Sequence, residues 1–363
     1  MTSRKLNALS LITLLLVQLT LAAEAQEFSN ENLASTTAPV VFNFVPTPDI
    51  EAIGSFAADS DSDIWGTSIS DSMALHFNGS TWTKVPMAKG SRVNKVAVLS
   101  RSNVWAVGQR TDNSSQIQHF NGTTWSVFPS PHFTAGENLN SLKVISANSI
   151  FAVGSTGGVT NRSPLVEHFN GSAWSVISVP KVAGGELFDI AIISPSDMWA
   201  VGDLLGTSTG APALALHFDG RRWSQVPTPI IAGLFGVTAL STSNVWAVGA
   251  RTNGPVVEHW NGTAWRVVKS PTIPSFGFLG SISAISPTDI WASGCESCGD
   301  AVGAPLLEHW NGTTWSLNPV PIEDRGIALN TVLALPSGHI FLGGFAFAQF
   351  GPSSAILEGT EGR

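Results

Sequence analysis

One short sequence pattern repeats along the chain and constrains its fold more than any other feature. Each copy contains Trp-Ala-Val-Gly or a close variant, followed after a variable segment by His-Phe/Trp-Asn/Asp-Gly-x-x-Trp. The first element occurs at intervals of about 40 to 50 residues, at Trp65, Trp105, Phe151, Trp199, Trp246, Trp291 and Phe341; the second occurs at His76, His119, His168, His217, His259 and His309. Repeats of this length, each with several short apolar runs, are typical of propeller blades. The sequence predicts an all-β, seven-bladed β-propeller with four-stranded antiparallel blades.

The unit from 236 to 268 shows how one blade is expected to form. It contains four short runs rich in β-branched and aromatic residues, at 236–241, 244–249, 255–260 and 263–268. Asn261-Gly262 predicts a two-residue type I′ hairpin, in which both central residues have positive φ. In the preceding turn, the short polar side chains from Ser241 to Asn244 are expected to bond nearby backbone N–H groups.

The two ends of the repeat region predict how the ring closes. The seventh unit has three expected strands, the third at 355–358, and ends before a fourth. The segment Phe42–Pro48 matches Trp223–Pro229 in spacing, with Phe42 at the Trp position. We therefore expect a propeller over residues 38–363 in which an N-terminal strand completes the last blade and covers its open edge.

The first residues have the features of an export signal. Arg4 and Lys5 precede a Leu-rich stretch, and Ala23-Glu24-Ala25 fits a small-x-small cleavage site. We expect a signal peptide at 1–25, a polar disordered lead-in at 26–37, and a secreted protein, extracellular or periplasmic. An uncleaved anchor is the less favoured alternative, because polar residues interrupt the apolar stretch.

Charge and composition narrow the classes of partner. The formal net charge is −8, and the 18 Lys and Arg residues are scattered rather than clustered. Nucleic-acid surfaces need clustered basic residues, so we expect no nucleic-acid partner. We also expect no membrane span after signal cleavage, and a monomer.

Cys295 and Cys298 are the chain's two cysteines and form a Cys-x-x-Cys pair. A local disulfide is the leading interpretation in an exported protein. A redox-active pair normally opens a helix of a β-α-β unit, which is not expected here. Zinc would need two further ligands, and neither a second Cys-x-x-Cys nor a His pair lies near in sequence. We therefore predict no metal and no cofactor.

The recurrent His and Trp residues favour a structural role. A catalytic or metal site needs groups that converge on one point, whereas these residues recur once in nearly every blade. We expect the imidazoles to bond neighbouring backbone groups and the Trp rings to pack between blades. Asn-Gly-Ser/Thr also fits the glycosylation pattern, but the hairpin turn already accounts for it.

The differences between the repeats predict a binding site. The loops between second and third strands and between blades vary in length and content, and both sets are expected on one face of the ring. Residues near the start of the inner strands should line the channel mouth there. The predicted ligand-binding residues are Asn94, Lys95, Asn140, Phe188, Asp189, Phe235 and Asn330. This mixture suits a neutral polar ligand such as a sugar, and the alternative is a water-filled channel with satisfied polar walls.

Catalysis is the less favoured class. Hydrolysis of a glycoside would need two facing carboxylates, and the nearest candidates are Glu186 with Asp189 and, farther out, Glu323 with Asp324. No Ser/His/Asp or Gly-x-Ser-x-Gly arrangement accompanies them. We therefore predict no catalytic residues.

The elements Ser-Pro-x-Asp-x-Trp-Ala-Val-Gly and Glu-His-Trp-Asn-Gly-x-x-Trp resemble those of exported bacterial β-propellers of the kelch and galactose-oxidase-like superfamily. The resemblance covers residues 38–363 and implies the propeller fold. Of the expected second-strand elements, only that of the last unit keeps the kelch Gly-Gly doublet, at Gly343-Gly344. No copper-ligand set transfers, because the chain has no Tyr. Propellers include lectins, hydrolases, lyases and scaffolds, so the resemblance implies architecture more than activity.

The expected function is a non-catalytic binding or interaction module. Its expected ligand is a carbohydrate or an envelope or extracellular protein, bound at the variable-loop face. The alternative is a carbohydrate-active enzyme, a glycosidase or lyase, that acts at the channel mouth.

Overall fold

The computed structural model describes residues 39–361, except 49, 70–71, 134–135, 159–160, 205–212, 230–232, 253, 298–302, 322–325 and 348–352. The chain divides into two compact units, Met1–Pro39 and Val40–Arg363. The expected signal peptide and lead-in lie outside the described residues and stay predictions. No helix in the described part of the chain has the length and apolar character needed to cross a bilayer.

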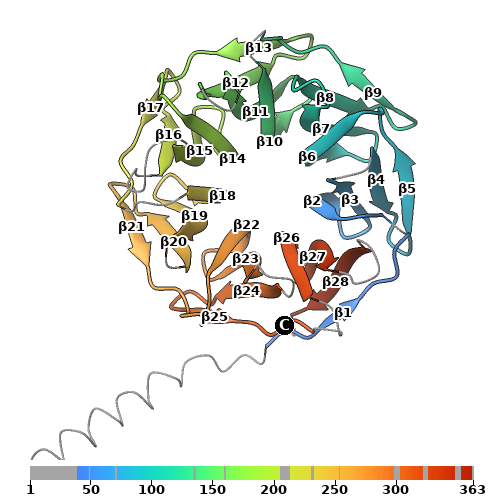
Figure 1. Cartoon of the computed structure of the whole chain (residues 1–363), viewed down its shortest axis with the longest axis vertical. Helices are drawn as coiled ribbons and strands as arrows, with labels where there is room; N and C mark the ends of the chain where they lie inside the picture. The colour runs from blue at the N-terminus through green and yellow to red at the C-terminus, as the bar shows by residue number, and fades with distance from the viewer. Residues whose placement is uncertain are drawn as a thin grey trace, which may run out of the picture. The chain divides into compact units, whose positions relative to one another are not determined.

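The second unit is a seven-bladed β-propeller, as predicted. Its 28 described strands form seven four-stranded antiparallel sheets around a central channel (Figure 1). In the first six blades, the strands follow chain order from the channel outward. Short apolar runs bounded by Gly, Pro, Asn and Ser favour such strands over helices.

The strand bounds follow the repeat. Blade 1 has β2 (Ile53–Ser60), β3 (Asp63–Ser68), β4 (Met73–Phe77) and β5 (Trp82–Pro86); blade 2 has β6 (Ser91–Ser100), β7 (Asn103–Arg110), β8 (Ser115–Phe120) and β9 (Trp125–Phe128); blade 3 has β10 (Glu137–Ser146), β11 (Ser149–Thr156), β12 (Ser163–Phe169) and β13 (Trp174–Ile177). Blade 4 has β14 (Gly185–Ser194), β15 (Asp197–Leu204), β16 (Leu214–Phe218) and β17 (Trp223–Gln225); blade 5 has β18 (Gly233–Ser241), β19 (Asn244–Arg251), β20 (Gly254–Trp260) and β21 (Trp265–Val268). Blade 6 has β22 (Gly277–Ser286), β23 (Asp289–Glu296), β24 (Ala304–Trp310) and β25 (Trp315–Leu317); blade 7 has β26 (Gly326–Ala334), β27 (His339–Phe347), β28 (Ser353–Thr360) and β1 (Phe42–Phe44).

The N-terminal strand closes the ring, as predicted. β1 pairs antiparallel with β28, with Phe42 opposite Gly359. Phe42 is buried and meets Trp291 of blade 6 edge-on, with ring centroids 6.2 Å apart. Asn318, just after β25, accepts a hydrogen bond from the Val40 N–H and donates one to the Val40 carbonyl. The closing strand is therefore held by both of the last two blades.

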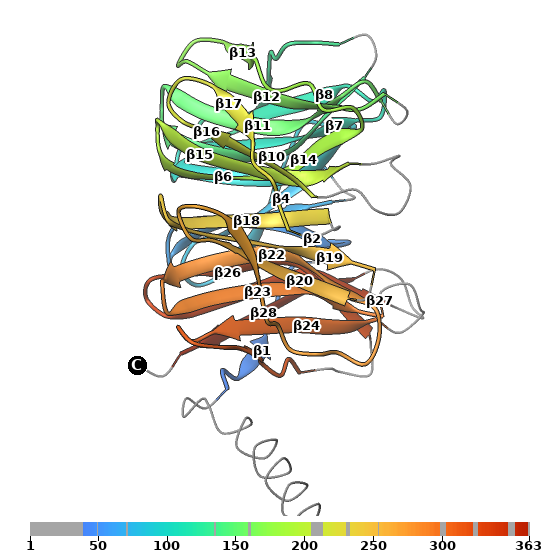
Figure 2. The same ribbon diagram turned by 90° about the vertical axis from the view of Figure 1, so that its left-hand side faces the viewer.

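The turns divide the ring into two unlike faces. Tight turns join first to second and third to fourth strands at one end, called here the turn face. The longer second-to-third loops and the blade-to-blade connections lie at the opposite end, the variable face. Figure 2 shows the ring from the side, with the strands running between these two faces. The predicted Ser turns form: the backbone N–H groups of Ser196 and Thr288 bond to the Ser194 and Ser286 hydroxyls.

The predicted two-residue hairpin is wrong. Trp260 pairs with Trp265, so the loop has four residues, and among its residues only Gly262 has positive φ, at 93°. The Asn261 side-chain oxygen accepts hydrogen bonds from the N–H groups of Thr263 and Ala264. This side-chain turn replaces the type I′ geometry. A Cβ on Gly262 would lie 2.8 Å from the Ser243 Cβ, so glycine is required by space as well as by φ.

Aromatic rings pack between blades, as predicted. Trp246 of blade 5, for example, lies with its ring centroid 4.9 Å from that of Trp310 and 5.8 Å from that of Trp315, both in blade 6. Trp65, Trp105 and Trp199 make the same two contacts with the following blade. The repeated rings therefore supply the interface that a single blade lacks.

Candidate functional site

A ring of β-bulges lies near the variable-face end of the channel. Each of the seven inner strands has one register shift there, which leaves one residue unpaired. The unpaired residues are Gly54, Asn94, Asn140, Phe188, Phe235, Gly280 and Asn330. A bulge re-aims its side chain away from the regular strand pattern. Five of the predicted ligand-binding residues are bulged residues, and the other two, Lys95 and Asp189, directly follow one.

The three bulged asparagines bridge neighbouring blades. Asn94 donates to the Leu139 carbonyl at 2.8 Å, Asn140 to the Leu187 carbonyl at 2.8 Å, and Asn330 to the Ile53 carbonyl at 2.9 Å. In each case the acceptor precedes the bulge of the next blade. These amide donors therefore hold the ring together, and they are less available to a ligand than the sequence suggests.

Asp189 is the centre of a group of contacts that joins blades 2 to 5 at the channel. Its carboxylate accepts hydrogen bonds from the Ser141 hydroxyl at 2.6 Å and the Val237 N–H at 3.0 Å, in the blades on either side. Lys95 of blade 2 reaches Asp189 of blade 4 with 3.8 Å between Nζ and Oδ1. Because this pair skips blade 3, the lysine side chain must lie within the channel.

Lys143 adds a second positive charge to the channel. It lies on β10, and its side chain is exposed although protein surrounds the channel. That enclosure lowers the pKa of Lys143; nearby Asp189 opposes this effect and nearby Lys95 adds to it. Within the described residues, no hydrogen bond or ion pair joins the Lys143 ammonium to another group. The equivalent positions in other blades are uncharged: Ala57, Ala97, Ala191, Thr238, Ser283 and Leu333.

An arc of phenylalanines lines the mouth on blades 4 to 6. Phe188 meets Phe235 edge-to-face with centroids 5.5 Å apart, and Phe235 meets Phe278 at 6.1 Å and 89°. All three side chains are half-buried. The sequence predicted Phe188 and Phe235, and the structure brings them together. Phe278 was missed because it lies two residues before the bulge of its own strand.

A second polar group lies on the side of β14 that faces blade 3, whereas Phe188 faces blade 5. Arg162 forms a salt bridge with Glu186, which also accepts a hydrogen bond from Asn140 at 2.9 Å. Glu186 pairs across the strands with Asp203, whose Oδ1 atom is buried without a hydrogen-bond partner among the described residues. Burial, together with the Glu186 charge, raises the pKa of Asp203 to about 6, and Arg162 opposes this shift. Glu186 and Asp189, the expected carboxylate pair, bind different donors: Asn140 and Arg162 contact Glu186, whereas Ser141 and Val237 contact Asp189. The other expected pair, Glu323 and Asp324, lies outside the described residues.

The recurrent histidines have a structural role, as predicted. Each stacks on the aromatic ring of the second strand, as His217 does on Trp199 with centroids 4.4 Å apart. The imidazole bonds to the side chain that begins the second strand rather than to the expected backbone group. The six bonds are His76–Asp63, His119–Asn103, His168–Ser149, His217–Asp197, His259–Asn244 and His309–Asp289, at 2.6 to 3.1 Å. Blade 7 reverses the pair, since His339 begins β27 and bonds to Glu358 at 2.9 Å.

Three glutamates are buried between blades, directly before recurrent histidines. Glu167, Glu258 and Glu308 are each 0% exposed. Burial raises the pKa of Glu167 to about 8, with a further contribution from Glu137, and raises the pKa of Glu258 and Glu308 to about 7. The Ser270 hydroxyl donates to Glu308, whereas both carboxyl oxygens of Glu167 and of Glu258 have no partner among the described residues.

The remaining predicted features are only partly described. Cys295 is buried at the end of β23 and is not a free thiol, but Cys298 lies outside the described residues.

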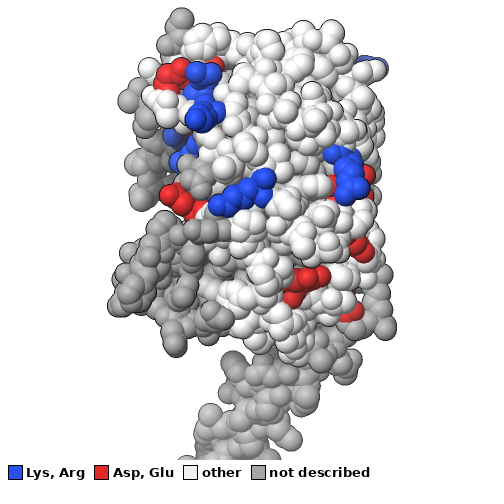
Figure 3. All heavy atoms as spheres, turned by 90° about the vertical axis from the view of Figure 1, so that its right-hand side faces the viewer, with Lys and Arg blue, Asp and Glu red and all other residues white. Residues whose placement is uncertain are grey.

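The side of the propeller at the right in Figure 1 carries few charged side chains, and these are scattered (Figure 3). No basic patch for a polyanion is visible on that side.

Comparisons with known proteins show the fold alone. No family model matches the chain, and the search of curated proteins found no match. Among solved structures, YCF48 bound to a D1 peptide is 14% identical, with a TM-score of 0.62, covering 91% of this chain and 99% of that chain. A streptogramin B lyase is 12% identical, with a TM-score of 0.66 and 91% and 100% coverage; the WD40 propeller domain of Doa1 is 11% identical, with a TM-score of 0.61 and 88% and 97% coverage. The resemblance to kelch and galactose-oxidase-like propellers stays a prediction.

Proposed function

We propose that this protein is a secreted, non-catalytic binding module whose ligand binds at the channel mouth on the variable face. The observation that carries the proposal is the arc of Phe188, Phe235 and Phe278. These rings keep part of their surface open at the mouth, although the repeat requires no aromatic residue at their positions. Concave sites with open aromatic surface and a few placed charges are typical of ligand recognition.

The chemistry of the mouth favours a segment of an extracellular protein as ligand. Apolar side chains of such a segment would pack on the phenylalanines, and a carboxylate would meet the ammonium of Lys143, which has no ion pair within the described residues. Solved propellers of this fold include one bound to a peptide. A carbohydrate, which the polar rim residues suggested, would make less use of Lys143.

Binding to immobilised peptides and to a glycan panel tests this proposal. We expect the purified chain to retain acidic, apolar peptides, and Phe235→Ala or Lys143→Met to weaken retention at least tenfold. Leu317→Ala is the matched control, because Leu317 is 50% exposed on the outer strand β25, away from the mouth. Retention of glycans alone would replace the peptide ligand by a carbohydrate, and equal binding by all variants would refute the site.

The second candidate is an enzyme, and the Glu186–Asp203 pair is the observation that favours it. A carboxyl group with a raised pKa beside a carboxylate is the arrangement of a general acid and its partner. A lyase is among the solved structures with this fold. If Asp203 acts as the acid, turnover should fall as pH rises through about 6, and Asp203→Asn should stop product release without loss of binding. The absence of any product from bound ligands would exclude this candidate.

A further inference from the structure

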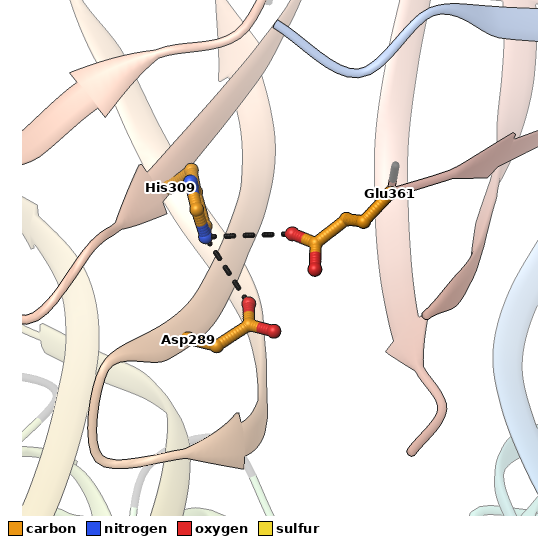
Figure 4. A group of neighbouring side chains, drawn as sticks. All are labelled: Asp289, His309 and Glu361. Carbon is orange, nitrogen blue, oxygen red and sulfur yellow. Dashed lines mark hydrogen bonds and ion pairs between the residues drawn. The ribbon is translucent and has the colours of Figure 1, made fainter. Parts of the chain in front are cut away.

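Three metal-ligating side chains converge on the turn face where blade 6 meets the end of blade 7. Asp289 begins β23, His309 lies on β24, and Glu361 directly follows β28 (Figure 4). The His309 Nε2 atom lies 3.1 Å from the Asp289 Oδ1 atom and 3.7 Å from the Glu361 Oε1 atom. All three ligand atoms lie within 4.8 Å of one another, and all three side chains are half-buried.

Glu361 distinguishes the blade 6 cluster from the equivalent positions of the other blades. The same His–Asp pair occurs in blade 4, where His217 bonds to Asp197 at 2.8 Å, and in blade 1, where His76 bonds to Asp63. Within the described residues, a further acidic group joins the pair only at blade 6. The repeat therefore accounts for two of the ligands but not for Glu361.

The blade 7 sequence departs from the repeat beside this cluster. In other blades an aromatic residue follows the third-strand histidine and packs on the second-strand aromatic ring of the preceding blade. Trp310, for example, packs on Trp246 with 4.9 Å between the ring centroids. Glycine, Gly359, occupies this position in β28. The Phe42 and Val40 side chains of the closing segment lie against Gly359 instead, and Phe42 meets Trp291 edge-on. The Glu361 side chain reaches His309 from the end of β28.

The backbone of Glu361 is fixed although it lies near the end of the chain. Its N–H donates to the Gly338 carbonyl at 3.0 Å, in the turn between β26 and β27. The side chain thus starts from a defined position, as a metal ligand requires.

The cluster has more acceptors than donors. The His309 Nε2 atom can carry one proton, and it faces two carboxylates. The Trp291 indole N–H donates to Asp289 at 3.0 Å and also interacts with the Glu361 carboxyl group, which lies within hydrogen-bond range of Asp289. One imidazole and one indole thus face two carboxyl groups. A bound cation would compensate both negative charges at once.

We propose that Asp289, His309 and Glu361 bind a divalent transition-metal ion, with Zn²⁺ as the probe of choice. One imidazole nitrogen and two carboxylate oxygens suit Zn²⁺ better than Ca²⁺ or Mg²⁺, which prefer oxygen ligands alone. Zinc–ligand distances of about 2.0–2.2 Å place tetrahedral ligands about 3.4 Å apart, so the three atoms need only small adjustments. The ion would link blade 6 to the end of β28, and water would complete its coordination.

Zinc titration of the untagged full chain, after removal of metals with EDTA, tests the proposal. We expect one Zn²⁺ to bind and to raise the Tm, because a ligand that binds only the folded state stabilises it. Glu361→Gln should bind at least about tenfold more weakly, in line with the loss of one of three ligands. Asp197→Asn is the matched control, since it alters the same His–Asp pair in blade 4, and it should bind as the wild type does.

Cobalt provides a second readout that does not depend on stability. Co²⁺ should give a visible absorption band with the wild-type chain and with Asp197→Asn, and no band with Glu361→Gln. The absence of zinc binding by a folded wild-type chain would overturn the proposal. Equal zinc affinity of the wild type and Glu361→Gln would also overturn it, because other surface groups would then bind the ion.

Discussion

Replacement of the buried Glu167 by Gln should make the protein more stable at pH 8 and leave its stability nearly unchanged at pH 4.5. Glu167 is 0% exposed, and its carboxyl oxygens have no partner among the described residues. Burial raises its pKa from 4.5 to about 8, so the folded protein keeps a proton that the unfolded chain has lost. The equivalent residue of blade 2 is the buried Gln118, which shows that the repeat accepts an amide at this position.

The magnitude follows from proton linkage. Between pH 4.5 and about 8 the folded state binds more protons than the unfolded state, so the free energy of unfolding falls as the pH rises. The stabilising contribution is complete below pH 4.5 and lost above about 8. The difference between the two pKa values corresponds to about 5 kcal/mol for Glu167. With an unfolding entropy of about 2.1 cal/mol/K per residue, this energy shifts the Tm of a propeller of this length by roughly 5–8 °C.

Urea denaturation at several pH values between 4.5 and 8.5 measures this effect. The wild-type midpoint should fall across this range, and that of Glu167→Gln should fall less. Glu51→Gln is the control, because Glu51 is exposed and its substitution should not change the pH profile. A wild-type stability that does not vary with pH, or a Gln variant less stable by the same amount at every pH, would refute the reasoning, since the carboxylate would then be ionised and well solvated in the fold.

Three further predictions concern the ring itself. Deletion of residues 38–48 should lower the Tm sharply, because it removes the buried Phe42 and exposes the edge of β28; an unchanged Tm would contradict the closure. Trp246→Ala should destabilise the fold by about 3–5 kcal/mol in urea denaturation, because the ring is 4% exposed between two blades. Asn140→Ala should cost about 1–3 kcal/mol through loss of its bonds to Glu186 and Leu187, and a neutral effect would mean that water replaces the amide.

Much of the fold is predictable because each blade repeats the same local signals. The turn residues, the alternating apolar runs and the match of Phe42 to the outer-strand Trp together define blade number and closure. The hairpin at Asn261 was predicted wrongly because Asn-Gly also fits a side-chain turn, and the choice depends on the four-residue spacing between Trp260 and Trp265. Sequence preference alone does not separate these geometries.

The candidate site was harder to predict because its residues come together only when the ring closes. No sequence pattern indicates that Asn94, Asn140 and Asn330 donate to the next blade, since their acceptors are backbone carbonyls. Lys143 could have been found, because it is the charged exception at a position that is uncharged in the other blades. The Arg162–Glu186–Asp203 group joins different strands, and no spacing rule connects its members.

The ring of bulges also bears on how such a protein acquires new binding properties. A bulged residue takes no part in strand pairing, so Gly, Asn or Phe can occupy it while the register of β2, β6, β10, β14, β18, β22 and β26 is unchanged. Blades with Gly54, Phe188, Phe235 or Gly280 at this position close without a bridging amide. The channel mouth is thus a set of seven equivalent positions whose side chains can be exchanged one at a time, by evolution or by design, without a change of strand register. Exchange of Asn94, Asn140 or Asn330 also removes an amide that bridges two blades.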